Sequence, residues 1–272
     1  MVLNHAFYEI QNGKIHVSEM GSGQPVLFIH GAPDSSSMWR DVIEQLPSGY
    51  RYIAPDLPGF GQSAAAPDFN WSLANRGQWV ADLLQTMGIS EPAILVGHDH
   101  GGGFVAPFAI QYPDRVSKIV LQNTVLHADY RWHSLAKVMR TPILGEFANF
   151  WMPYPIMLPF LVSNMKSNAP GLSKDYIAGL QKTITHQMGT AMLKLYRASS
   201  PSEFKGWEEK LNALIAVKPT LVIWGEHDHY IPLWVAKRWE KCGAKLLQFP
   251  DGGHWLAIEK PSAYAQQLTA FF

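Results

Sequence analysis

Asp99 stands between two glycines in the sequence Gly-His-Asp-His-Gly (97–101), directly after the apolar run 94–96. An apolar run rich in β-branched residues that stops at a glycine predicts a buried strand. The glycines at 101–103, followed by a second apolar run, predict a sharp turn into a helix. A residue at the apex of such a turn is held clear of the backbone, which requires small neighbours. We therefore predict that Asp99 is a nucleophile, although an ordinary helix-capping aspartate would also fit this turn.

An aspartate at this position determines which reactions are open to the site. A carboxylate attacks saturated carbon that bears a leaving group and forms an alkyl ester of the enzyme, whereas a serine attacks a carbonyl and forms an acyl-enzyme. The sequence therefore argues against esterase or lipase activity, which would need serine at the apex.

The elements that must position Asp99 alternate between strand and helix patterns along most of the chain. Period-two and continuous apolar runs predict strands at 14–19, 25–30, 52–54, 118–123, 219–225 and 245–249, and helical spacing predicts helices at 37–46 and 75–87. From about residue 125 to residue 211 this alternation stops, and the segment is rich in Met, Leu, Pro and aromatic residues. We expect this segment to be helical.

The spacing Gly-x-Asp-x-Gly resembles the nucleophile elbow of the α/β-hydrolases, in the epoxide hydrolase and haloalkane dehalogenase branch that carries aspartate instead of serine. The loop Asp-Leu-Pro-Gly-Phe-Gly-Gln-Ser at 56–63 is also similar to a pattern of that family. The resemblance implies an α/β-hydrolase fold, with a mostly parallel sheet flanked by helices. The core would comprise 1–124 and 212–272, and a helical cap of 125–211 would cover the pocket.

The resemblance also assigns the other catalytic roles. Asp228, just past the predicted strand 219–225, stands where ligands bind in open α/β sheets and would be the acid of the triad, and His254 would be the base. The other acid position used in this family is occupied by Asn123, which cannot carry the charge. The backbone N–H groups of Ala32 and His100 would form the oxyanion hole. A plain strand-to-helix loop would also account for the segment around Ala32.

The cap of such a hydrolase supplies the residues that select the substrate. Tyr196, in Leu-Tyr-Arg-Ala, matches the family's second cap tyrosine, which would protonate an opening epoxide, and Tyr154 is the candidate for the first. His30, Trp151 and Tyr130 are expected around the pocket, and Tyr130 is a second candidate for the first acid. Any of the cap aromatics could instead be ordinary core residues.

The resemblance implies hydrolysis of an epoxide to a diol, with haloalkane or haloacid dehalogenation as the alternative. His100 stands where haloalkane dehalogenases usually carry a halide-binding Trp, and Ala32 stands where one subgroup has Asn, so halide release is less well supported. A third possibility is a member of the fold that binds a small ligand without turning it over. The resemblance implies no cofactor.

Composition limits the partners. The chain has 22 basic and 22 acidic residues and no formal net charge, which argues against binding to nucleic acid or anionic membrane and suits a small neutral organic substrate. The single cysteine, Cys242, excludes internal disulfides and favours a cytoplasmic location, and either a monomer or a homodimer is compatible. The histidines at 98, 100, 227, 229 and 254 could suggest a metal site. However, side chains alternate along a strand, so we expect none.

Overall fold

The computed structural model describes residues 3–272, so the first two residues of the expected core lie outside it. Eight strands form one sheet in the order β1-β2-β4-β3-β5-β6-β7-β8. Their bounds are β1 (Asn4–Ile10), β2 (Gly13–Gly21), β3 (Gln24–Ile29), β4 (Tyr50–Pro55), β5 (Ala93–His98), β6 (Val116–Gln122), β7 (Thr220–Gly225) and β8 (Lys245–Phe249). The pairs β1–β2 and β2–β4 are antiparallel and the others are parallel. The predicted mostly parallel sheet is confirmed.

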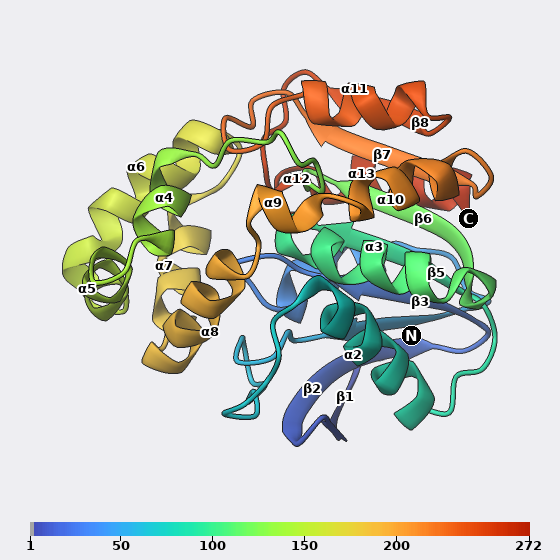
Figure 1. Cartoon of the computed structure of the whole chain (residues 1–272), viewed down its shortest axis with the longest axis horizontal. Coiled ribbons are helices and arrows are strands. Elements are labelled where there is room, and N and C mark those ends of the chain that lie inside the picture. The colour runs from blue at the N-terminus through green and yellow to red at the C-terminus, as the bar shows by residue number, and fades with distance from the viewer. Residues whose placement is uncertain (1–2) are drawn as a thin grey trace.

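Helices cover both faces of the sheet. Those of the two flanking layers are η1 (Ser36–Trp39), α1 (Arg40–Ile43), α2 (Leu73–Thr86), η2 (Asp99–Gly101), α3 (Gly102–Gln111), η3 (Pro113–Arg115), α10 (Trp207–Ile215), α11 (Trp234–Lys241), α12 (Leu256–Glu259) and α13 (Pro261–Phe271). In Figure 1, α2, α3 and α10 lie in front of the sheet, and α12 and α13 lie behind it. Within residues 3–272, no helix is both long and apolar enough to cross a bilayer.

The remaining helices lie between β6 and β7 and form what we call the helical insertion, residues 134–204. They are α4 (Ser134–Arg140), α5 (Leu144–Trp151), η4 (Pro155–Met157), α6 (Leu158–Asn168), α7 (Lys174–Thr183), α8 (His186–Arg197) and α9 (Pro201–Phe204). Helices α4 to α8 gather beside one end of the sheet (Figure 1). The expected boundary between residues 211 and 212 falls inside α10, which packs against α3. The exact division into core and cap domains stays a prediction.

The central strands form because their sequences can be buried on both faces. Every residue of β5 and β7 is buried, as continuous apolar runs in a parallel sheet require. Helix α2 buries Trp79, Leu83 and other residues at helical spacing, and Ser72 caps it by accepting a hydrogen bond from the Asn75 N–H at 3.3 Å.

Two elements differ from the sequence predictions. The edge strand β1 was not predicted, because its residues are mostly exposed and carry no apolar alternation. The helix expected at 37–46 consists of the short helices η1 and α1 and ends at Ile43. Neither difference moves the residues around Asp99.

The turn after β5 depends on close backbone contacts that only glycine allows. A Cβ on Gly101 would lie 2.2 Å from the carbonyl oxygen of Ile29 in β3, and a Cβ on Gly97 would lie 2.6 Å from the Val105 side chain in α3. Glycine therefore lets β3, β5 and α3 approach one another directly behind the apex residue.

We predict that Gly101→Ala destabilises the protein by about 3 kcal/mol, because the atom that its Cβ meets belongs to the backbone of a central strand. The control is Gly179→Ala in α7, where a Cβ would meet nothing within 4 Å. That change should stabilise the fold by about 0.5 to 1 kcal/mol through helix propensity. Urea denaturation measures both, and equal stability of the two variants would contradict the packing described for this turn.

Candidate active site

Asp99 lies at the apex of the turn between β5 and α3 and has a left-handed backbone conformation, with φ at 50°. This conformation is strained for a residue with a side chain, and it turns the side chain away from the strand. A Cβ on Gly31 would lie 2.4 Å from the Asp99 Cβ, so the loop after β3 also needs glycine here. The Thr124 hydroxyl donates to the Asp99 carbonyl at 2.5 Å, which fixes the apex from the end of β6.

The two carboxylate oxygens of Asp99 have different surroundings. Oδ1 accepts a hydrogen bond from the backbone N–H of Ala32 at 3.0 Å, whereas Oδ2 lies 3.6 Å from Nε2 of His254. Burial by itself would raise the pKa of Asp99, but electrostatic interactions with the neighbouring histidines and the backbone hydrogen bond from His100 outweigh burial and lower it. The carboxylate is therefore ionised at neutral pH, as a nucleophile must be.

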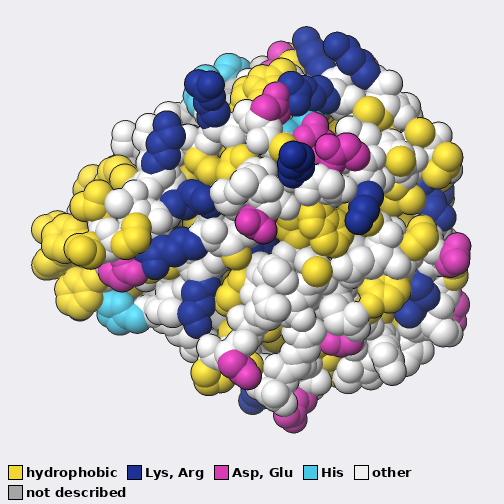
Figure 2. All heavy atoms as spheres, in the orientation of Figure 1, with side chains coloured by type: hydrophobic (Ala, Val, Ile, Leu, Met, Phe, Trp, Pro, Cys, Tyr) yellow, Lys and Arg dark blue, Asp and Glu magenta, His cyan; other side chains and the backbone are white. Residues whose placement is uncertain are grey.

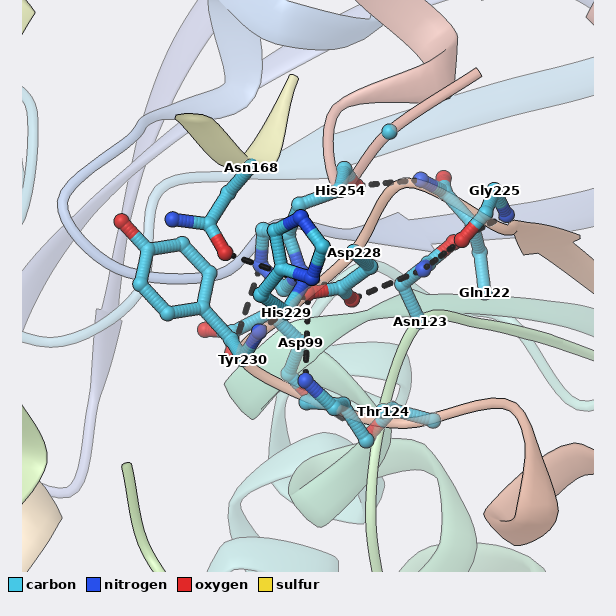
Figure 3. A network of polar contacts seen from close by, with 12 residues as sticks. Asp99, Gln122, Asn123, Thr124, Asn168, Gly225, Asp228, His229, Tyr230 and His254 are labelled. Atoms are coloured by element: carbon cyan, nitrogen blue, oxygen red, sulfur yellow. Dashed lines mark hydrogen bonds and ion pairs between the residues drawn. The ribbon is translucent and has the colours of Figure 1, made fainter. Parts of the chain in front are cut away.

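His254 is held between the two aspartates (Figure 3). Its Nδ1 lies 2.7 Å from Oδ2 of Asp228, so Nδ1 carries the proton that it donates and Nε2 is left facing Asp99. Burial would lower the pKa of His254, but the charge and hydrogen bond of Asp228 raise it above its usual value. Sequence analysis selected these three residues from motifs that are far apart in the chain, and the structure places them together.

The carboxylate of Asp228 is fully buried and surrounded by donors. Its Oδ1 accepts from the backbone N–H groups of Tyr230 at 2.8 Å and Ile231 at 3.1 Å. Its Oδ2 accepts from the Asn123 side chain at 2.8 Å as well as from His254. The sequence showed only that Asn123 occupies the family's other acid position and cannot carry a charge. In the structure its amide orients Asp228.

Three further residues hold the backbone of His254, and sequence reasoning assigned this task to none of them. The His254 carbonyl accepts from Nε2 of His98 at 2.9 Å and from the Gln122 side chain at 3.0 Å. The His254 N–H donates to the carbonyl of Asn168, at the end of α6, at 2.7 Å. Burial lowers the pKa of His98 to about 3, so its ring is neutral. The position of His98 and Gln122 at strand ends was a signal that could have pointed to them.

His100 follows Asp99, and its backbone hydrogen bond is one of the contributions that lower the pKa of Asp99. Its ring packs edge-on against Tyr196, with ring centroids 4.6 Å apart, and stacks on Trp132 at 6.0 Å. Burial lowers the pKa of His100 to about 4, so the side chain is neutral. Within residues 3–272, no group of three or more His, Cys, Asp or Glu side chains is arranged to hold a metal ion.

A cavity of about 50 Å³ opens above Asp99. Its polar lining comes from Asp99, His133, Asn164, Tyr196, Tyr230 and His254, and its apolar lining from Ala32, Pro33, Leu135, Met139, Met152, Leu161, Met165, Met192 and Trp255. All the methionines belong to the helical insertion or its loops. A space of this size holds only a few water molecules, so a larger substrate requires the flexible methionine side chains to move.

Tyr196 lies in α8 and faces the cavity together with Asp99. Two arginines fix the backbone beside it, since Arg76 donates to the Leu195 carbonyl at 3.3 Å and Arg140 donates to the Tyr196 carbonyl. Burial and the charge of Asp99 raise the pKa of Tyr196 well above its usual value, so the hydroxyl keeps its proton.

The structure does not bring the other expected pocket residues to the cavity. Trp151 and Tyr154 lie on the outer surface of the insertion, with 39 % and 41 % of their area exposed. Tyr130 is buried, and its hydroxyl donates to the Tyr230 carbonyl at 2.8 Å. His30 is completely buried, and both ring nitrogens are occupied, one by the Gly31 carbonyl at 2.7 Å and one by the Leu57 N–H at 2.9 Å.

These four residues were expected around the pocket because of their type and their approximate position in the chain. Helical spacing defines a face of a helix but does not say which face points inward. The cavity is instead lined by His133 and Tyr230, which the sequence did not single out.

A buried aspartate at a strand-to-helix apex, with an Asp-paired histidine facing it, is the arrangement of an α/β-hydrolase site. Over residues 24–261 the sequence matches the family described as alpha/beta hydrolase fold. The chain belongs to this family, and the resemblance seen in its motifs is confirmed.

Three relatives show the range of activities nearby. A 2-hydroxy-6-oxononadienedioate/2-hydroxy-6-oxononatrienedioate hydrolase of Paraburkholderia phymatum is 27 % identical, over 95 % of this chain and 90 % of its own. Haloalkane dehalogenase 2 of Mycobacterium tuberculosis is 26 % identical, over 98 % and 94 %. Bifunctional epoxide hydrolase 2 of Sus scrofa is 38 % identical, over 96 % of this chain and 53 % of its own.

Solved structures share the fold over nearly the whole chain. The Cif epoxide hydrolase from Acinetobacter nosocomialis has a TM-score of 0.85 at 21 % identity, covering 99 % of this chain and 89 % of its own. The haloalkane dehalogenase DatA from Agrobacterium tumefaciens C58 has a TM-score of 0.83 at 24 % identity, covering 99 % and 96 %. TM-scores this high establish the common fold, whereas identities this low leave the substrate open.

We predict that the pKa of His254 lies above its usual value in the wild type and falls in Asp228→Asn, because the aspartate supplies the main contribution that opposes burial. Since the folded pKa is raised, the stability it contributes is present at low pH and is lost as pH rises through that pKa. NMR titration of the His254 ring measures the shift. The control is Asp251→Asn on the same loop, which is exposed and pairs with Lys260, and it should leave the titration unchanged. An unchanged pKa in Asp228→Asn would contradict the pairing.

Proposed function

We propose that this protein hydrolyses epoxides to diols through an ester of Asp99. The ester is supported by the unequal pair of Asp99 oxygens, one held by the Ala32 N–H and one facing the cavity and His254. Such a carboxylate is prepared to attack saturated carbon through Oδ2 while Oδ1 stays bound. The observation that carries the choice of an epoxide is the protonated Tyr196 hydroxyl in the same cavity.

The reaction would proceed in two steps. In the first step Oδ2 attacks an epoxide carbon, the carbon–oxygen bond of the ring breaks, and the ring oxygen takes a proton from a donor in the cavity. In the second step His254 removes a proton from water through Nε2, and the resulting hydroxide attacks Cγ of Asp99. The negative charge then develops on Oδ1, where the N–H groups of Ala32 and His100 would stabilise it. The bond between Cγ and the ester oxygen then breaks, and the departing alkoxide takes the proton from His254 to complete the diol. The carboxylic acid left on Asp99 returns its proton to the donor that lost one in the first step.

Two donors in the cavity suit the ring oxygen. Tyr196 keeps its proton and lines the same cavity as Asp99. His133 uses Nδ1 to accept from the Ala136 N–H at 3.3 Å, so in the neutral ring Nε2 carries the proton. Burial lowers the pKa of His133 to about 4, which keeps the ring neutral at pH 7. We assign Tyr196 as the acid and His133 as the second donor, in place of Tyr154 and Tyr130.

The substrate is proposed to be small, neutral and largely apolar, because nine of the fifteen residues that line the cavity are apolar and six of these are methionine or leucine. An organohalide is the second candidate, since the same donors could hold a departing halide and a haloalkane dehalogenase is among the relatives. A ligand-binding protein without turnover is the third. A cytoplasmic location stays a prediction from the single cysteine.

We predict that His254→Gln accumulates the alkyl ester on Asp99, because the first step needs no base and the second does. Intact-protein mass spectrometry after addition of styrene oxide should show one adduct per chain, and diol formation should fall by at least about a hundredfold.

Asp99→Ala is the control and should carry no adduct. A His254→Gln protein that reacts no faster than Asp99→Ala would remove His254 from the hydrolytic role. Halide release from 1-bromohexane without diol formation from any epoxide in a panel would replace the epoxide proposal by the dehalogenase.

We predict that Tyr196→Phe slows alkylation by epoxides by roughly a hundredfold, the lower scale of general-acid assistance. Reaction with haloalkanes should change little, because halide leaves without a proton. Single-turnover rates followed by mass spectrometry in the His254→Gln background separate alkylation from hydrolysis.

Tyr154→Phe is the matched control, because that hydroxyl lies on the outer surface of the insertion and should not affect either rate. Equal losses on both substrate classes in Tyr196→Phe would show that the tyrosine shapes the cavity and is not the acid.

A further inference from the structure

The helical insertion carries a large apolar surface on the side that faces away from the cavity. Eight residues, each between 39 % and 82 % exposed, form what we call the insertion-tip face: Ile143, Leu144, Phe147, Phe150, Trp151, Tyr154, Ile156 and Phe160. The aromatic members are continuous, because Trp151 contacts Phe147, Phe150 and Tyr154 with ring centroids 5.5 to 6.4 Å apart. Figure 2 shows hydrophobic side chains gathered at this end of the molecule, over α5 of Figure 1.

Helix α5 exposes its large apolar side chains, whereas an ordinary surface helix turns them toward the core. Its inner side carries Gly145 and Asn149, both buried, whereas its outer side carries Phe147 and Phe150. The inner fit is close, since a Cβ on Gly145 would lie 2.5 Å from the Met139 carbonyl oxygen in α4, and a Cβ on Gly189 in α8 would lie 2.0 Å from the Asn149 side chain. The helix therefore cannot rotate its aromatic residues inward without losing these contacts, and a monomer leaves them in water.

The area of this face matches what one partner gives to a stable protein interface. Taking roughly 200 Å² for a fully exposed large side chain, the eight exposed fractions correspond to about 900 Å². A standard interface takes about 800 Å² from each partner, and the largest apolar patch on a typical monomer is about 300 to 600 Å². Within residues 3–272, the exposed large apolar residues outside the insertion, such as Val217, form no comparable surface.

The charges favour a second copy of the chain over a lipid surface. The only charged residue of α5 is Glu146, which is already paired with Arg197 at 2.7 Å, so the face has no cationic excess for anionic headgroups. The chain as a whole has no net charge to keep two copies apart. Phe, Trp and Tyr, which make up five of the eight residues of this face, are the residue types enriched in protein interfaces.

We propose that the insertion-tip face binds the same face of a second copy, forming a symmetric homodimer. The helices at the interface also reach the cavity, since Met152, Leu161 and Met165 follow or belong to α5 and α6 and line it from the inside. The proposal does not depend on the identity of the substrate.

The test is analytical ultracentrifugation of the full chain at concentrations from about 0.1 to about 100 µM, a range that includes the micromolar Kd of the weaker interfaces of this size. The wild type should sediment as a dimer of 30.4 kDa chains. Phe147→Glu should raise the dimer Kd by at least about thirtyfold, the scale of a central interface residue. Val217→Glu is the matched control, because Val217 is 79 % exposed outside the face and should leave the Kd unchanged.

Two results would overturn the proposal. One is a wild type that stays monomeric at about 100 µM. The other is a dimer whose Kd responds equally to both variants or to neither, because the interface would then lie elsewhere. Flotation with phosphatidylcholine vesicles tests whether the face binds lipid instead. If the protein is a monomer that binds vesicles, and only Phe147→Glu abolishes this binding, the face binds a lipid surface and not a second copy. Circular dichroism of each variant verifies that the fold is intact.

Discussion

The ionised carboxylate of Asp99 is the feature on which the rest of the structure depends. A charge with only 13 % of its side chain exposed costs several kcal/mol unless neighbouring groups stabilise it. Here the stabilising groups come from different parts of the chain: the Ala32 N–H after β3, His254 after β8 and the backbone of His100 in η2. The sheet must therefore bring three strand ends to one point. The glycines at 31, 97 and 101 allow it by removing the atoms that would clash.

The sequence was sufficient to predict the parts of this arrangement that follow from local rules. Asp99, Asp228 and His254 each follow the carboxyl end of a strand that its own apolar run predicts, and parallel strands bring those ends to one edge. The same local patterns were enough to predict where the central strands lie along the chain and that the segment after β6 is helical. Asn123 shows the limit, because its position could be noted from the sequence, but its amide bond to Asp228 depends on the placement of β6 beside β7.

The helical insertion is where local rules were least informative. The usual expectation that aromatic residues of a helix face the core fails for α5, whose inner side is filled by Gly145 and Asn149. Trp151 and Tyr154 consequently lie outside, and the cavity is lined by residues whose types gave no signal, such as His133 and the methionines. A helix can face a cavity on one side and solvent or a partner on the other. The spacing of its apolar residues does not show which of the two sides they face.

The sheet and the insertion determine two different properties of the site, the geometry of attack and the choice of substrate. The proposed nucleophile, base and oxyanion donors all stand just past the ends of strands, and their mutual distances depend on backbone contacts that tolerate no side chain. The donors proposed for the leaving oxygen and much of the cavity wall stand on the insertion or directly before it. The insertion is joined to His254 through the hydrogen bond from the His254 N–H to the Asn168 carbonyl. Attack by the carboxylate is common to epoxides and organohalides, so it cannot distinguish them. The choice between them rests on whether a proton is delivered at the wall opposite Asp99, and this wall can change with the insertion while the sheet stays the same.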